Sequence, residues 1–99
     1  MIRREGERLI LAGPATLAQV AALLPQGNQQ IAEGISVIDL GEVTDLDSSL
    51  LATLLAWLRE ARRLGRTLSI ARMPQGLVTI AGLYGVADLL PVQAPAAHH

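Results

Sequence analysis

Apolar residues fall into short strand-like runs separated by longer stretches with helical spacing. The strand-like runs cover Arg8–Ala12, Ile35–Leu40 and Thr67–Ala71. Helical spacing is found after Thr16, in a short piece at Gln29–Glu33, over residues 48–64, and from Pro74 to about Leu83. This alternation predicts a small α/β domain, and right-handed crossovers would make the successive strands parallel.

The first helical stretch has Thr16 as its predicted cap. The residues expected on its packed face are Leu17, Val20, Ala21 and Leu24. Pro25-Gln26-Gly27 is expected to interrupt it, because proline lacks a backbone donor and clashes with the preceding turn.

The helix over residues 48–64 has two dissimilar faces. The face expected in the core carries Leu50, Leu51, Leu54, Leu55, Leu58 and Ala61. The opposite face begins with small side chains and reads Ser49, Ala52, Thr53, Ala56, Glu60 and Arg63. Alanine is the best helix former, so this face has a simple structural explanation, but small residues also permit close approach by a partner. Trp57 lies near the border and is favoured as a core-edge residue over an interface anchor.

The segment before this helix concentrates polar groups where a strand gives way to a helix. The sequence predicts a short polar loop after Leu40 that ends in Asp47 and Ser48. Either side chain would suit the helix start, and an ionised Asp there is favoured by the helix dipole. The functional alternative is a Ser48 hydroxyl presented to a kinase or partner, with phosphate altering docking by charge and bulk.

Composition narrows the classes of function. The chain has 99 residues, enough for one domain, with a hydrophobic fraction of 51% and a formal charge of −1, which disfavours a nucleic-acid partner. Cysteine is absent, which excludes thiol catalysis and zinc–thiolate sites. No apolar run approaches the roughly 20 residues of a membrane span, and the start lacks a signal peptide's apolar stretch. The chain is therefore expected to be cytoplasmic, with residues 94–99 as a disordered tail whose two histidines are a purification-tag remnant.

The sequence gives little support to an enzyme. Ser48 has no histidine base outside the tail, and neither a P-loop nor a GxGxxG pattern occurs. Asp39, Glu42, Asp45 and Asp47 are acidic neighbours, but three of them lie on the predicted loop or its edge and are expected to be solvated or to act as caps. No metal or cofactor is expected.

The strand–loop–helix around Asp47 resembles the motif of STAS domains, the sulfate transporter and anti-sigma factor antagonist family. Asp39-Leu40 matches the strand end, and Asp47-Ser48-Ser49 matches the first three positions of its D-[ST]-x-G motif, with Leu50 in place of the glycine. The resemblance extends from about Arg8 to Val92. The segment Ile80–Pro91 resembles the end of the MlaB-like branch, the STAS subunits of bacterial phospholipid transporters that maintain outer-membrane lipid asymmetry.

The resemblance implies a STAS-like fold over residues 1–93, with a small mixed sheet of about four strands packed with helices. It also implies a non-catalytic adaptor that binds the MlaF-like cytoplasmic ATPase of an ABC transporter, and through it the permease. The protein would then be peripheral to the inner membrane, without inserting into it. The implied partner-binding residues are Asp47, Ser48, Ser49, Ala52, Thr53, Ala56 and Glu60. The alternative is an anti-sigma factor antagonist switched by phosphorylation of Ser48, which Leu50 disfavours because its side chain stiffens the junction.

Overall fold

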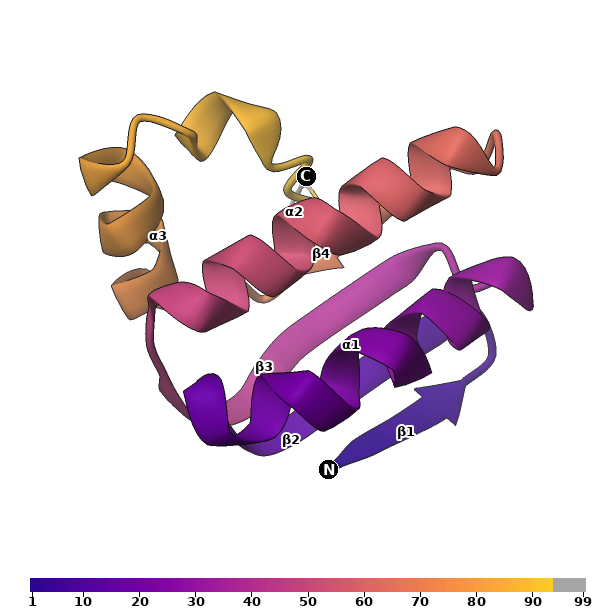
Figure 1. The fold of residues 1–99 in the computed structure, drawn as a ribbon, viewed down its shortest axis with the longest axis horizontal. Helices are drawn as coiled ribbons and strands as arrows, with labels where there is room; N and C mark the ends of the chain where they lie inside the picture. The colour runs from indigo at the N-terminus through magenta and orange to yellow at the C-terminus, as the bar shows by residue number, and fades with distance from the viewer. Residues whose placement is uncertain (94–99) are drawn as a thin grey trace, which may run out of the picture.

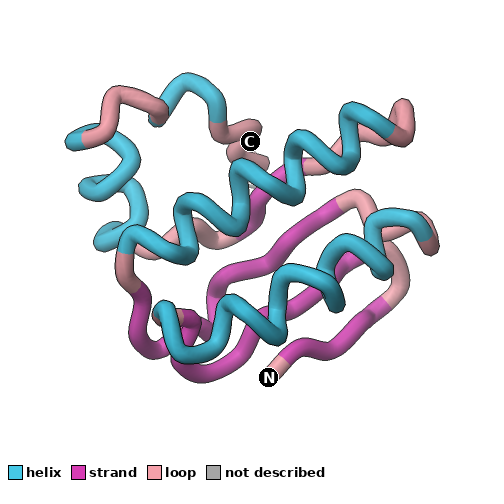
Figure 2. Tube along the Cα trace, viewed as in Figure 1, coloured by secondary structure: helices cyan, strands magenta, loops and turns pink. Residues whose placement is uncertain are grey.

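The computed structural model describes residues 1–93, and the predicted tail at 94–99 lies outside the described residues. The elements in chain order are β1 (Ile2–Glu5), β2 (Arg8–Ala15), α1 (Leu17–Ala32), β3 (Val37–Leu46), α2 (Ser48–Arg63), β4 (Ser69–Ala71), α3 (Gln75–Leu83) and the single-turn 3-10 helix η1 (Ala87–Leu89). Figures 1 and 2 show α1 and α2 side by side in front of the sheet, with α3 and η1 beyond the outer side of α2.

The four strands form one mixed sheet in the order β1-β2-β3-β4. β1 is antiparallel to β2, whereas β2, β3 and β4 are mutually parallel. Parallel neighbours need a crossover, and α1 and α2 supply the two that are required. The predicted parallel arrangement of the three later strands is confirmed, as is a mixed sheet of about four strands.

The core lies between the sheet and the helices, and it is almost entirely aliphatic. Its fully buried members other than Trp57 are Leu9, Leu11, Ile31, Ile35, Ile38, Leu40, Leu50, Leu54, Ile70 and Leu77. The predicted core face of α2 is confirmed at Leu50, Leu51, Leu54 and Ala61. Leu55 and Leu58 are only half-buried and border the surface between α2 and η1.

Trp57 fills the space between the two long helices. Its ring is 0% exposed, and its indole Nε1 donates a hydrogen bond to the carbonyl oxygen of Leu24 at 3.0 Å. Gly27 lies directly against the ring, so that a Cβ at this position would overlap the indole. The prediction that Trp57 belongs to the core and is not an interface anchor is confirmed. The ring is fully buried, whereas a position at the edge of the core was expected.

The predicted interruption of the first helix is wrong, because α1 continues through Pro25. Proline removes the donor that would bond the Ala21 carbonyl, but both residues are exposed, so water can satisfy that carbonyl. The predicted packed face is also wrong in part, since Leu17 and Ala21 are exposed. The buried residues of α1 are Leu23, Gly27 and Ile31.

The polar loop predicted after Leu40 is largely a continuation of β3, which runs to Leu46. The second half of β2 pairs with it, with register shifts on either side of Ala12 and Gly13, so its backbone groups are satisfied despite polar side chains. β1 was missed because it is a short edge strand whose only apolar residue is Ile2. The strands predicted from 35 and from 67 begin later, at Val37 and Ser69.

Candidate functional site

Asp47 holds the starts of both long helices. It is the N-cap of α2, where its Oδ1 accepts hydrogen bonds from the Ser49 amide at 2.9 Å and from the Ser49 hydroxyl. Its Oδ2 accepts from the amide of Leu17, the first residue of α1, at 3.1 Å. The Ser49 hydroxyl and then the Leu17 amide hold the pKa of Asp47 below its usual value. Asp47 is therefore an ionised cap, as one of the two interpretations predicted.

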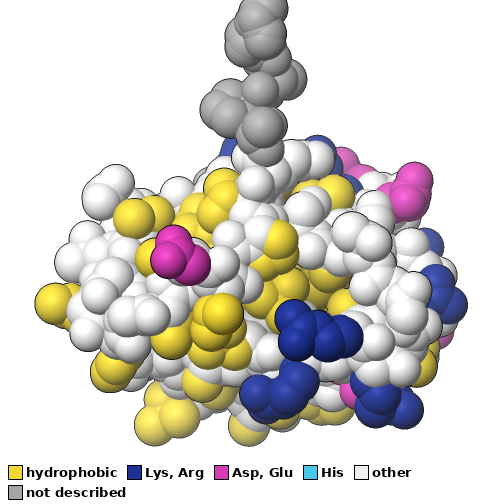
Figure 3. Space-filling view, turned by 90° about the horizontal axis from the view of Figure 1, so that it is seen from above, with side chains coloured by type: hydrophobic (Ala, Val, Ile, Leu, Met, Phe, Trp, Pro, Cys, Tyr) yellow, Lys and Arg dark blue, Asp and Glu magenta, His cyan; other side chains and the backbone are white. Residues whose placement is uncertain are grey.

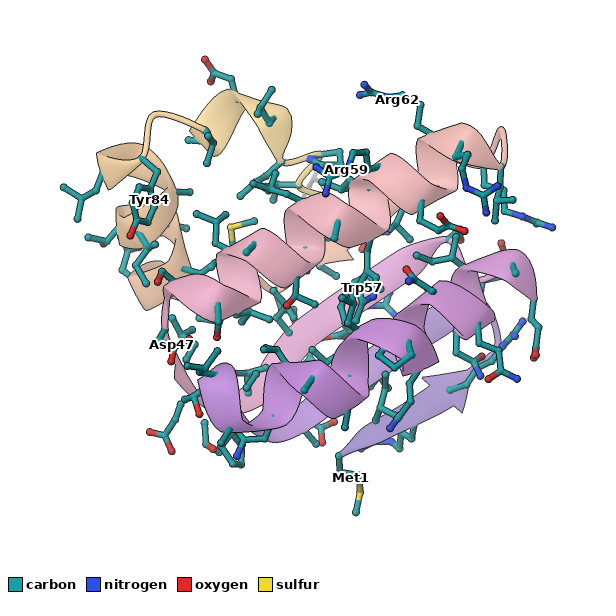
Figure 4. The ribbon with its side chains drawn as sticks, viewed as in Figure 1. Met1, Asp47, Trp57, Arg59, Arg62 and Tyr84 are labelled. Atoms are coloured by element: carbon teal, nitrogen blue, oxygen red, sulfur yellow. The ribbon has the colours of Figure 1, made fainter. Side chains whose placement is uncertain are left out.

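Ser48 follows as the first residue of α2 and is exposed. Its hydroxyl makes no side-chain hydrogen bond within residues 1–93. One turn later, Ala52 is also exposed, and both residues border a hollow of about 330 Å3 between α2 and the end of α3. This apolar hollow is lined by Ser48, Leu51, Ala52, Leu55, Tyr84 and Val86. Figure 4 shows Asp47 and Tyr84 on opposite sides of the first turn of α2.

The other predicted partner-binding residues lie on a different part of α2. Thr53 is only 5% exposed, and its Oγ1 donates to the carbonyl of Ser49 at 2.8 Å, so its predicted place on the outer face is wrong. Ser49, Ala56 and Glu60 share its helical stripe and are half-buried. The reason is that α1 packs against this side of α2. The side of α2 that stays exposed is therefore the one nearer to α3.

Glu60 is also engaged within the molecule. Its carboxylate pairs with Arg63 one turn later, with 2.6 Å between Oε2 and Nη2. Arg63 lowers the pKa of Glu60 from its usual value. Of the seven residues predicted to bind a partner, Ser48 and Ala52 are thus the two that the structure places together on an open surface.

Several residues of this surface were missed from the sequence. Leu55 was assigned wholly to the core, but it lines the apolar hollow, as do Tyr84 and Val86 from beyond α3. Tyr84 is 63% exposed. The sequence signal that could have identified it is its place as one of two aromatic residues, at the end of the last predicted helix. Figure 3 shows apolar side chains gathered on this side of the molecule, with basic side chains beside them.

Asp39 alternates along β3 with the core residues Ile38 and Leu40, and so lies on the sheet face opposite to the long helices. Its side chain is only 3% exposed and contacts two arginines. Arg8 donates to Oδ2 at 2.8 Å, Arg72 donates to Oδ1 at 2.9 Å and to Oδ2 at 3.1 Å, and the Gly41 amide donates to Oδ1 at 2.8 Å. Burial acts to raise the pKa of Asp39, but these hydrogen bonds outweigh it and hold the pKa below its usual value. The cluster ties β2, β3 and the end of β4 together.

Within residues 1–93, no group of three or more acidic or histidine side chains is arranged to hold a metal ion. None of the helices described is both long enough and apolar enough to cross a bilayer.

The fold is similar to those of solved anti-sigma factor antagonists. The unphosphorylated form of SpoIIAA superposes with a TM-score of 0.67 at 13% identity, covering 96% of this chain and 88% of that one. The phosphorylated form of Bacillus SpoIIAA gives 0.65 at 13% identity, with 96% and 91% covered. A Thermotoga maritima protein described as an anti-sigma factor antagonist gives 0.74 at 12% identity, with 97% and 86% covered. At these identities the likeness establishes the fold alone.

A search of curated proteins finds no match to the chain. The family model described as "Mlab, STAS domain" matches residues 1–91, which is nearly all of the described structure. The chain therefore belongs to the family of MlaB-like STAS domains.

Proposed function

We propose that this protein is a non-catalytic adaptor that binds the cytoplasmic, MlaF-like ATPase of an ABC-type phospholipid transporter. It would sit at the inner membrane through that ATPase and its permease, and support their assembly and activity. The observation that carries the proposal is the apolar hollow beside Ser48, because an open apolar surface next to the motif hydroxyl can receive side chains of a protein partner.

The start of α2 is suited to binding a partner without rearrangement. Asp47 fixes the first turn of α2 to α1, and Leu50 anchors it in the core at 0% exposure. A surface that is already ordered loses little conformational entropy on binding. Ala52 adds no long side chain, so a partner's side chain can enter the hollow beside Tyr84. An adaptor of this kind supports its partner by binding one conformation or assembly more tightly than others.

Replacing Ala52 with arginine is expected to remove binding to the ATPase while leaving the fold intact. The side chain would occupy the mouth of the hollow, and the exposed position tolerates it, so we expect at least about a tenfold loss of affinity. The measurement is co-purification of an ABC ATPase with the tagged protein, followed by titration of the purified pair. The thermal midpoint is expected to change by no more than about 2–3 °C.

The matched control is Ala22→Arg, which places the same side chain on an exposed position of α1, remote from the hollow. It is expected to bind like the wild type. Equal binding by the Ala52 and Ala22 variants would overturn the docking surface, and the absence of any ABC ATPase among the co-purified proteins would overturn the proposed function.

Phosphorylation of Ser48 defines the second candidate function, an anti-sigma factor antagonist. The observation in its favour is the exposed hydroxyl of Ser48, which has no partner in the described part of the chain. A phosphate there would adjoin the ionised Asp47, whose charge would repel it. Recovery of a Ser48-phosphorylated protein that has lost an anti-sigma factor partner, instead of an ATPase, would establish this alternative.

A further inference from the structure

Two arginines of α2 differ from the other arginines of the described residues. The eight positively charged residues are all arginine, and six of them bond to other described residues through their side chains. Arg59 and Arg62 form no ion pair or hydrogen bond through their guanidinium groups within residues 1–93. They lie one turn apart and are both exposed, so two uncompensated positive charges stand side by side.

These two arginines line a groove between α2 and η1. The groove has a volume of about 240 Å3, and its lining residues are Leu55, Leu58, Arg59, Arg62 and Leu89. Leu89 is 62% exposed, which leaves a large apolar side chain in water beside the two charges. Figure 4 shows Arg59 and Arg62 on the side of α2 that faces η1. Because Leu55 also lines the apolar hollow, the groove continues the proposed docking surface toward the C-terminal end of α2.

The combination specifies the chemistry of a complementary surface. Leucine side chains are covered by other apolar side chains, whereas guanidinium groups pair with carboxylates, often through two parallel hydrogen bonds. Guanidinium groups one helical turn apart suit two carboxylates that are also one turn apart on an amphipathic helix. A membrane surface fits less well, because stable attraction to anionic lipids uses clusters of about 4–8 cations. Within residues 1–93 only two arginines are unpaired, the net charge of the chain is −1, and Asp88 of η1 lies next to Leu89.

We propose that the groove between α2 and η1 binds an acidic amphipathic segment of the ATPase, whose apolar residues cover Leu58 and Leu89 and whose carboxylates pair with Arg59 and Arg62. This inference rests on the proposed function and adds a second, electrostatic contact to the one at Ala52. The charged contact selects the partner and speeds association, while the apolar hollow supplies most of the buried area.

The test is to reverse the two charges singly and together. Arg59→Glu and Arg62→Glu are each expected to weaken binding to the purified ATPase by about tenfold, and the double variant by more. Arg63→Glu is the matched control, because it makes the same change in charge on the same helix but outside the groove. Its pair with Glu60 is exposed, and exposed ion pairs contribute little, so the affinity of this variant is expected to stay within about threefold of the wild type. The wild-type affinity is expected to fall with added salt, and less so in the double variant.

The outcomes separate this inference from the proposed function. If the wild type binds the ATPase and Ala52→Arg abolishes binding, but the groove variants bind like Arg63→Glu, then the acidic segment is excluded and the adaptor function stands. Sedimentation with vesicles of equal parts phosphatidylglycerol and phosphatidylcholine tests whether the groove binds a membrane surface instead. Vesicle binding that the Arg59 and Arg62 variants remove, without any change in ATPase affinity, would assign the groove to a membrane surface and overturn the inference.

Discussion

Replacing Trp57 with alanine is expected to lower the free energy of unfolding by about 3–5 kcal/mol. The ring is 0% exposed and occupies the contact between α1 and α2, so its loss leaves a cavity that the two helices cannot close without moving on the sheet. The Leu24 carbonyl also loses the indole donor. Urea unfolding followed by circular dichroism measures the change; tryptophan fluorescence is unsuitable because Trp57 is the only tryptophan.

Two further variants test the same contact from opposite sides. Trp57→Phe keeps most of the ring volume but removes the indole N–H, and is expected to cost about 1–2 kcal/mol. Gly27→Ala raises helix propensity by about 1 kcal/mol, yet its Cβ would overlap the ring. Overpacking is expected to prevail, with a net loss of about 1–3 kcal/mol. An alanine variant of Trp57 within about 1 kcal/mol of the wild type would show that the ring does not hold the helices together.

The same contact explains why the sequence predicted the core of α2 but misplaced its open face. The spacing of Leu50, Leu54 and Ala61 defines the arc toward the sheet. The spacing does not indicate on which side of that arc a second helix packs. The small residues taken as a docking stripe lie largely on the flank that meets α1, where Thr53 is buried. The small side chains at that position allow α1 and α2 to pack closely. The exposed residues of the first turns of α2 are instead Ser48 and Ala52.

The contacts of Asp39 with two arginines could not be predicted from the sequence either. A lone aspartate inside an apolar strand is a visible anomaly, but its arginine partners lie 31 and 33 residues away in the chain. Only strand register brings them together, because Asp39 is the partner of Ala71 in β4 and Arg72 follows directly. Arg72 has a positive φ of 53°, which turns its side chain back over Gly41, where a Cβ would overlap the guanidinium. The spacing of residues along the chain cannot predict that the side chain of Arg72 reaches back to Asp39.

Replacing Asp39 with asparagine is expected to lower the free energy of unfolding by about 2–3 kcal/mol at neutral pH. The amide keeps the shape of the carboxylate, but its NH2 group cannot accept a hydrogen bond from a guanidinium. The arginine side chains are 38% and 59% exposed, so water can partly compensate them, and the loss stays below that of a fully buried pair. Asp45→Asn on the same strand is the matched control, since Asp45 is exposed, and it is expected to change stability by less than about 0.5 kcal/mol.

The pH dependence of that difference identifies the ionised carboxylate as its source. The pKa of Asp39 is lowered in the folded protein, while in the unfolded chain it lies near 3.9. The stabilisation is therefore complete above about pH 5 and decreases as the pH falls through 3.9 toward the lower folded-state pKa. Glu42, Asp47 and Glu60 also have lowered pKa values and lose stabilisation over the same range, so the wild type and the variant must be compared at each pH. Unfolding curves between about pH 7 and pH 3 are expected to converge for the two proteins, because protonated Asp39 resembles the amide. A difference of constant size across this range would show that the variant acts through packing and not through the charge of Asp39.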